Sequence, residues 1–200
     1  MSRYLAWGSM RHTSGLSIAL AAIWVLSGCA ILEPDPKDDA PKNVKAFEMN
    51  EGYALLYDLV SKEKQVSLLS IIKKESPELK SLLERISETS TVTAKELETL
   101  ARINPPVNLK TTHLPRMEQA ARESIDKETS KEILQSDGVE LEFNMVSSQL
   151  AAMNYAAHLA RSLAVIEANP RRKEFLQRTA QKYSELHSQV YKMLFTRYKR

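Results

Sequence analysis

The segment that decides the fold is residues 77–103, PELKSLLERISETSTVTAKELETLARI. Its leucine and isoleucine side chains, with Thr93 among them, recur every three or four residues, which is the spacing of one face of an α-helix. Ser76 precedes Pro77, and a serine followed by proline at the first helical position is typical of a helix start. The prolines after Asn104 end the pattern. The sequence therefore predicts a long helix whose buried face comprises Leu79, Leu82, Leu83, Ile86, Thr93, Leu97 and Leu100.

The same spacing recurs in three other long segments, at about 51–74, 138–168 and 171–198. Four amphipathic helices of this length bury their apolar faces only against one another, which predicts an all-α, four-helix bundle. The connection at 104–137 contains a shorter, weakly amphipathic helix at about 116–135. Ferritin-like folds place such a long connection between the second and third long helices, so we expect a ferritin-like bundle.

The composition excludes several classes of protein. The chain has 5 Gly against 8 Pro and only 6% aromatic residues, which disfavours sandwiches, barrels and dinucleotide-binding sheets. A single Cys excludes a disulfide framework and a multi-cysteine metal site. No phosphate-binding loop, HExxH motif or nucleophile elbow occurs in the sequence, so we name no catalytic residue and expect no enzyme.

The N-terminus has the features of a secretory signal. Residues 1–15 contain Arg3 and Arg11 and no acidic residue, and the apolar run LSIALAAIWV follows at 16–25. A basic segment, a short apolar segment and small residues at its end are typical of a signal peptide. An apolar run of roughly 10 to 14 residues is short for a membrane-spanning helix.

The stretch Leu26-Ser27-Gly28-Cys29 resembles the lipobox of bacterial lipoproteins at all four positions. The resemblance implies that a diacylglyceryl group joins the Cys29 sulfur, that cleavage precedes Cys29, and that the new amino terminus is acylated. Two or three acyl chains make a stable anchor, whereas one is marginal. The resemblance also implies a location, because an aspartate directly after the lipidated cysteine retains such lipoproteins in the inner membrane, so Ala30 favours the periplasmic face of the outer membrane. The alternatives are an ordinary cleaved signal and an uncleaved anchor.

The chain accordingly divides into a signal peptide at 1–28, a lipidated flexible tether at 29–49 and a helical bundle domain at 50–200. The tether contains the charged, proline-rich stretch EPDPKDDAPK at 33–42, which lacks any helical period. Removal of 1–28 takes away two of the 28 basic residues and none of the 25 acidic ones, so the remaining chain is nearly neutral.

Polar side chains interrupt the apolar faces halfway along the four long segments. Such a layer is either a hydrogen-bonded network that fixes helix register or a metal site. The chain contains no Glu-x-x-His motif, so we expect no metal, with Glu63 and His187 as the remaining weak candidates. The predicted layer is Glu63, Ser90, Thr93, Tyr155, His158 and His187.

Residues 51–195 resemble a ferritin-like family of secreted bacterial proteins, domain of unknown function 4142. Glu63 lies fourteen residues before Pro77, as an acidic residue does in that family, and His187 matches its last histidine. The resemblance implies a ferritin-like bundle, and the departures from the family pattern imply that most metal ligands are lost. We therefore expect no cofactor beyond the lipid on Cys29. The departures lie at Thr89-Ser90, Asn144 and Tyr155.

The last predicted helix, 171–198, is strongly basic. Residues 170–200 contain nine basic and two acidic side chains. One interpretation is contact with anionic lipid headgroups, and the other is ordinary solvated charge that suits the negative end of the helix dipole. The residues concerned are Arg171, Arg172, Lys173, Arg197, Lys199 and Arg200, with Tyr191, Phe195 and Tyr198 beside them.

These features together predict an outer-membrane-associated bacterial lipoprotein. Its bundle would be a structural or interaction module with a protein partner in the cell envelope, and we expect no nucleic-acid partner. The alternative is a metal-binding, ferritin-like bundle of the periplasm, related to oxidoreductases.

Overall fold

The computed structural model describes residues 42–69, 73–110 and 113–198, and this part of the chain is all-helical, without any strand. It contains five α-helices and one short 3-10 helix, so the all-α class is confirmed for the described residues. The elements are α1 (Lys42–Glu63), η1 (Val66–Leu68), α3 (Pro77–Leu100), α4 (Arg116–Gln135), α5 (Gly138–Ile166) and α6 (Pro170–Tyr198).

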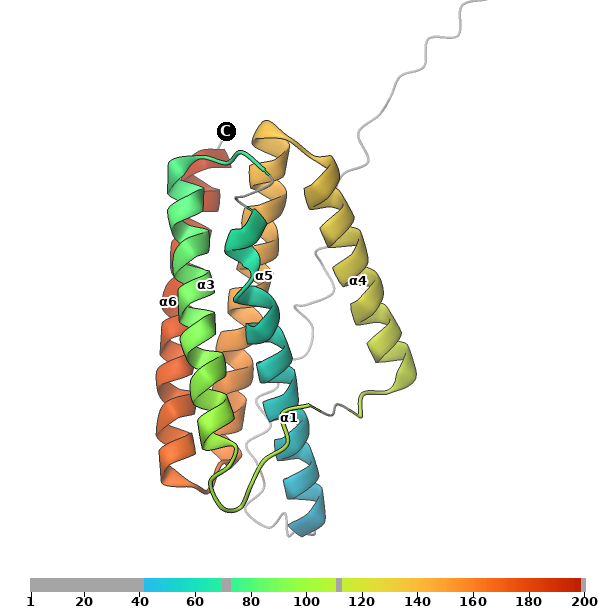
Figure 1. Ribbon diagram of the computed structural model, residues 1–200, viewed down its shortest axis with the longest axis vertical. Helices are drawn as coiled ribbons and strands as arrows, with labels where there is room; N and C mark the ends of the chain where they lie inside the picture. The colour runs from blue at the N-terminus through green and yellow to red at the C-terminus, as the bar shows by residue number, and fades with distance from the viewer. Residues whose placement is uncertain (1–41, 70–72, 111–112, 199–200) are drawn as a thin grey trace, which may run out of the picture. The chain divides into compact units, whose positions relative to one another are not determined.

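Helices α1, α3, α5 and α6 lie side by side, and α4 flanks them (Figure 1). Helices α3 and α6 run in opposite directions, because Ser76 before α3 meets Arg197 at the end of α6, at 2.7 Å. Glu96 near the end of α3 likewise meets Arg178 in the first half of α6, at 2.9 Å. These contacts fix the relative position of two helices whose start points are far apart in the sequence.

One apolar core lies between these four helices, which we call the core helices. Leu56 of α1, Leu83 of α3 and Leu176 of α6 are all completely buried. Helix α5 supplies small side chains such as Ala156 and Ala160, which let its neighbours approach closely. Burial of each leucine-sized side chain stabilises the fold by roughly 1.5–3 kcal/mol, so the aligned apolar faces hold the helices together.

Most of the predicted helix bounds agree with the structure to within about three residues, but the first helix differs. Helix α1 begins at Lys42 instead of 51, and it therefore takes in 42–49, which were assigned to the tether. Pro41 is the last helix-breaking residue before Gly52, so nothing in 42–51 prevents the helix from extending toward the N-terminus. The helix also ends at Glu63 instead of 74, and η1 follows it.

Among the described residues, none of the helices has the length and hydropathy of a membrane-spanning segment. The predicted signal peptide at 1–28, the predicted lipobox residues Leu26, Ser27, Gly28 and Cys29, and most of the predicted tether lie outside the described residues.

Candidate binding groove

Helix α4 is only loosely packed against the core helices. Ile133 is its one buried side chain, and Met117 and Ile125 are 81% and 64% exposed. The helix is supported from within by pairs one turn apart, such as Arg122 with Glu118 at 2.7 Å. Two polar contacts tie it to its neighbours. Lys62 of α1 reaches Asp126 at 2.7 Å, and Arg122 donates to the Tyr155 hydroxyl of α5 at 3.1 Å.

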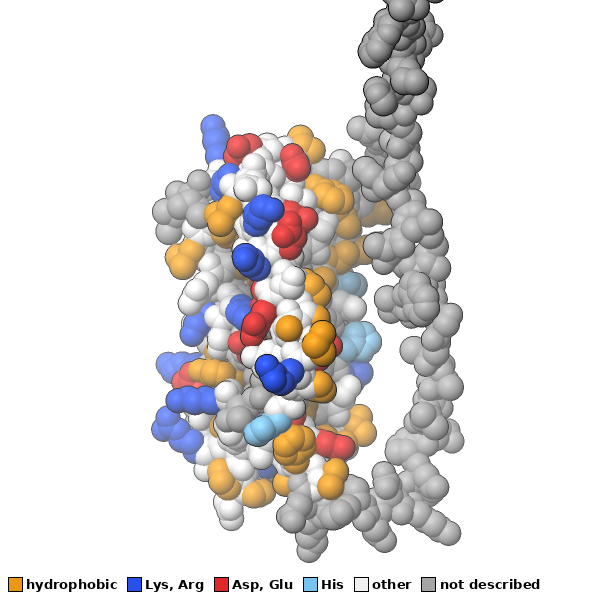
Figure 2. Space-filling model, turned by 90° about the vertical axis from the view of Figure 1, so that its right-hand side faces the viewer, with side chains coloured by type: hydrophobic (Ala, Val, Ile, Leu, Met, Phe, Trp, Pro, Cys, Tyr) orange, Lys and Arg blue, Asp and Glu red, His pale blue; other side chains and the backbone are white. Residues whose placement is uncertain are grey.

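A cavity of about 860 Å³ lies between α1, α4 and α5. This volume is in the range of sites that bind small organic molecules. Figure 2 views the molecule from the α4 side and shows hydrophobic side chains exposed among charged ones. The apolar part of the cavity wall comprises Leu55, Leu59, Val66, Leu69, Ile125, Ile133, Ala151 and Ala152.

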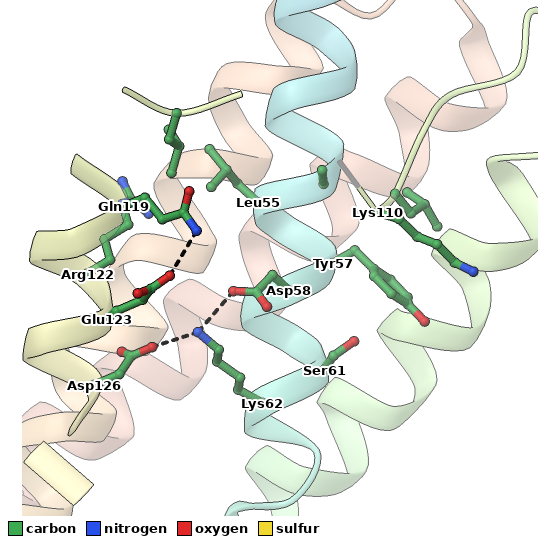
Figure 3. Close-up of a pocket in the computed structure, with 13 residues that line it drawn as sticks. Leu55, Tyr57, Asp58, Ser61, Lys62, Lys110, Gln119, Arg122, Glu123 and Asp126 are labelled. Atoms are coloured by element: carbon green, nitrogen blue, oxygen red, sulfur yellow. Dashed lines mark hydrogen bonds and ion pairs between the residues drawn. The ribbon is translucent and has the colours of Figure 1, made fainter. Parts of the chain in front are cut away.

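A second cavity of about 420 Å³ lies against the same face of α1, beside the N-terminal half of α4 and the segment around Leu109 (Figure 3). Both cavities are lined by Leu55, Asp58, Lys62, Arg122 and Asp126, so they are neighbouring sections of one groove. The Lys62 ammonium lies at their junction, 3.1 Å from Asp58 and 2.7 Å from Asp126. We call the two sections together the α1–α4–α5 groove.

Glu63, the last residue of α1, is part of the wall of the larger cavity. Its Oε2 is shielded from solvent and has no hydrogen-bond partner among the described residues, and the same holds for Gln149 Oε1. Burial raises the pKa of Glu63 to about 7, although the Gln149 side chain and the charge of Lys62 act in the opposite direction. The groove therefore has two hydrogen-bond acceptors beneath its surface that lack a donor.

Behind Glu63, the hydroxyls of Ser90 on α3 and Tyr183 on α6 lie 2.9 Å apart and are buried. Burial raises the pKa of Tyr183 to about 12, Ser90 and Thr93 lower it by hydrogen bonding, and the nearby Glu63 carboxylate raises it. The phenol is therefore neutral at ordinary pH. Glu63, Ser90, Thr93, Gln149 and Tyr183 form a polar layer to which all four core helices contribute.

Three of the six residues that the sequence predicts for a polar layer belong to the layer that the structure shows. Glu63, Ser90 and Thr93 lie in it, whereas Tyr155 is 37% exposed and contacts α4, and His158 is exposed beside Arg161 at 3.3 Å. His187 is half-buried and belongs to no hydrogen bond that links it to the layer. The sequence missed Gln149 and Tyr183. Gln149 was detectable as a lone amide between the inward positions Met145 and Met153.

A second buried polar group, which the sequence did not predict, lies at the α5–α6 turn, beside the middle of α1. The Arg172 guanidinium donates to both oxygens of Glu167, at 2.8 and 3.2 Å, and the Tyr53 hydroxyl donates to Glu167 at 2.7 Å. Arg172 also donates to the carbonyls of Ile103 and Pro105. Burial alone would raise the pKa of Glu167, but these donors lower it below its usual range. This group joins α1, the segment after α3, and the α5–α6 turn.

The structure corrects the prediction that Arg172 belongs to a lipid-facing basic surface. Its side chain is 1% exposed, because Glu167 and two carbonyls hold it inside. Arg197 is also engaged, with Ser76 at 2.7 Å and Glu142 at 3.2 Å. Arg171 and Lys173 remain exposed, and Lys199 and Arg200 lie outside the described residues.

Within the described residues, no group of three or more histidine, cysteine or acidic side chains is placed to hold a metal ion. Comparison with protein-family models, with curated proteins and with solved structures gave no match.

Proposed function

We propose that this chain is a bacterial envelope lipoprotein, anchored through lipid on Cys29, whose helical domain is an interaction module. The observation that carries the proposal is Leu26-Ser27-Gly28-Cys29 directly after the apolar run at 16–25. The pattern explains why the chain has a single cysteine. Several acyl chains hold a protein at the membrane, and confinement to a surface raises its effective concentration near partners.

The arrangement of the helices supports a four-helix bundle of ferritin-like topology as the finer fold. Helices α1 and α3 pair directly, and the connection that holds α4 leads to α5, which pairs with α6 through a short turn. A long connection between the second and third core helices is the feature that ferritin-like folds share.

Helix α4 and the groove beneath it support the interaction role. Twenty residues of ordered helix bury one side chain, whereas a helix that served only to complete the core would bury a whole face. Exposed apolar side chains in a concave surface are typical of binding sites. The proposed location is the periplasmic face of the outer membrane, because Ala30 follows Cys29.

The anchor is tested by replacing Cys29 with Ala in the full chain and expressing both forms in a diderm bacterium with a labelled fatty acid. We expect the wild-type chain to incorporate the label and to sediment with outer membranes, and Cys29→Ala to lose both properties. A matched control, Ser27→Ala, keeps a small residue in the lipobox and retains both. If Cys29→Ala stays in the membrane without label, the anchor is the apolar segment at 16–25 instead.

A further inference from the structure

We propose that the α1–α4–α5 groove binds a small cationic amphiphile, whose apolar chain lies on the groove wall and whose ammonium group pairs with Glu63. The inference concerns a ligand site on the helical domain, so it does not depend on the Cys29 anchor.

The shape of the groove suits an alkyl chain. The larger section has a volume of about 860 Å³, and its wall is formed by aliphatic side chains of three helices, including Leu59, Ile125 and Ala152. Ile125 is 64% exposed on α4 although it lines this cavity, so apolar surface that the fold leaves open is present where a chain would lie. Its coverage by a ligand removes apolar surface from water, which is favourable in proportion to the area.

The charge of the groove selects a cation. Lys62 is bonded to both Asp58 and Asp126, and Arg122 is bonded to Glu118 and stacked 5.4 Å over the Tyr155 ring. Each basic side chain of the larger cavity is therefore already engaged. Among the carboxyl groups that line the larger cavity, only Glu63 has no bonded cation within the described residues, and acidic residues outnumber basic ones in this lining.

The polar atoms beneath the groove lack donors. Glu63 Oε2 and Gln149 Oε1 are both acceptors, and neither has a partner among the described residues. An ammonium group has three donors and no acceptor, so one such group would satisfy both oxygens. Because the carboxyl oxygen lies beneath the surface, only a group that enters the groove and shifts the covering side chains reaches it.

Glu63 makes binding dependent on pH, and charged or titratable groups surround it on every neighbouring helix of the groove. They are Asp58 and Lys62 on α1, Glu118, Arg122 and Asp126 on α4, Tyr155 on α5 and Tyr183 on α6. Glu63 has a pKa of about 7, and the neutral acid attracts a cation less than the carboxylate does. We therefore expect binding to strengthen between pH 6 and pH 8.

The test uses the full chain in lipid nanodiscs and three photoreactive probes with the same eight-carbon, diazirine-bearing chain that end in an amine, an alcohol or a carboxylate. Adducts are mapped by mass spectrometry. We expect the amine to label groove residues at least tenfold more than either other probe at pH 8, and about threefold less at pH 6. Glu63→Gln lowers labelling of the groove by the amine about fivefold, whereas Glu84→Gln, an exposed change on α3, leaves it unchanged.

A second variant tests the cavity itself. Ala152→Trp fills the apolar wall, and we expect it to abolish groove labelling by every probe while circular dichroism stays helical. If the alcohol labels the groove as well as the amine does, or if Glu63→Gln leaves amine labelling intact, the cation site is wrong. Labelling confined to residues 1–41, with none in the groove, overturns the ligand site altogether.

Discussion

Arg172 and Glu167 form a fully buried two-point ion pair, with Arg172 Nε 2.8 Å from Glu167 Oε2 and Arg172 Nη2 3.2 Å from Glu167 Oε1. The pair spans the α5–α6 turn, and Tyr53 joins it from α1. Asn169, within the turn, donates its backbone N–H to Glu167 at 2.7 Å. Arg172 also donates to the carbonyls of Ile103 and Pro105, just after α3. The group therefore fixes how the end of α3, the end of α5 and the start of α6 meet.

We expect the removal of Arg172 alone to destabilise the fold strongly, because it leaves the Glu167 carboxylate buried without a cation. We predict that Arg172→Met lowers the free energy of unfolding by about 3 to 5 kcal/mol in urea denaturation. The double variant Arg172→Met with Glu167→Gln removes both charges, and we expect it to regain at least half of this loss. Equal instability of the single and double variants would show that packing of the arginine, and not its charge, matters.

The pKa of Glu167 also predicts a response to acid. A carboxyl whose pKa is lowered in the folded state contributes stability that is fully present above its unfolded pKa. This contribution is lost as the pH falls through the lower folded value. The wild-type chain should therefore lose stability toward strongly acidic pH, and Glu167→Gln should flatten that limb of the curve of unfolding free energy against pH.

The ionisation of Glu63 affects stability in the opposite direction to that of Glu167. Its pKa rises from 4.5 to about 7 on folding, so the folded state prefers the protonated form. Stability should be unaffected by this group below pH 4.5, should fall as the pH rises from 4.5 to 7, and should carry the full penalty above 7. At 1.36 kcal/mol per pKa unit the penalty is about 3 kcal/mol.

We therefore predict that Glu63→Gln stabilises the chain by about 2 to 3 kcal/mol at pH 8 and by almost nothing at pH 4.5. Thermal and urea unfolding at both pH values measure this difference, with Glu84→Gln as the exposed control. A Glu63→Gln variant that is less stable than wild type at pH 8 would show that the carboxylate is a favourable member of the polar layer.

The helices were predictable from the sequence because their limits are set locally. Ser76 caps α3 by accepting from the Leu79 N–H, and Asn169 caps α6 by accepting from Arg171 and Arg172 N–H. Each cap lies within three residues of the groups that it bonds, so a single stretch of sequence contains the whole signal. The predicted start of α1 is wrong because the proline-rich, charged tether was extended to 49, whereas the helix begins directly after Pro41, at Lys42.

The polar layer was only half predictable, because α5 is apolar on nearly all sides. Its alanines and leucines occur on several faces, so the sequence does not show which face points inward, and Tyr155 was chosen where Gln149 is the buried residue. The Arg172–Glu167 pair was not predictable. Each residue looks like an exposed charge near a helix end, and its burial depends on Tyr53, 114 residues away from Glu167.

Gly52 has a packing role, from which a further prediction follows. A Cβ atom at this position would lie 2.5 Å from Leu163 Cδ2 and 3.1 Å from Leu163 Cγ. Alanine has the higher helix propensity, by about 1 kcal/mol, but the clash with a buried leucine outweighs it. We expect Gly52→Ala to destabilise the chain by about 1 to 3 kcal/mol.

A double-mutant cycle checks the cause of this loss. Combined with Leu163→Ala, the Gly52→Ala change should become neutral or favourable, because the obstructing side chain is gone. Strictly additive losses would exclude the clash between these two residues as the reason for the glycine.

The last prediction concerns the mobility of α4. Because Ile133 is its one buried side chain, α4 should open without unfolding of the core helices. By hydrogen exchange with mass spectrometry, we expect amides of 116–131 to exchange at least ~100-fold faster than those of 82–97 in α3.

Ile133→Ala should raise α4 exchange strongly, since loss of a buried isoleucine costs about 2 to 5 kcal/mol. Asp126→Asn should raise it only a few-fold, because the Lys62–Asp126 pair is more than half exposed and such pairs contribute less than about 1 kcal/mol. Equal protection of α4 and α3 would show that α4 is an integral part of the core, and the groove beneath it would then be a fixed cavity instead of one that α4 can open.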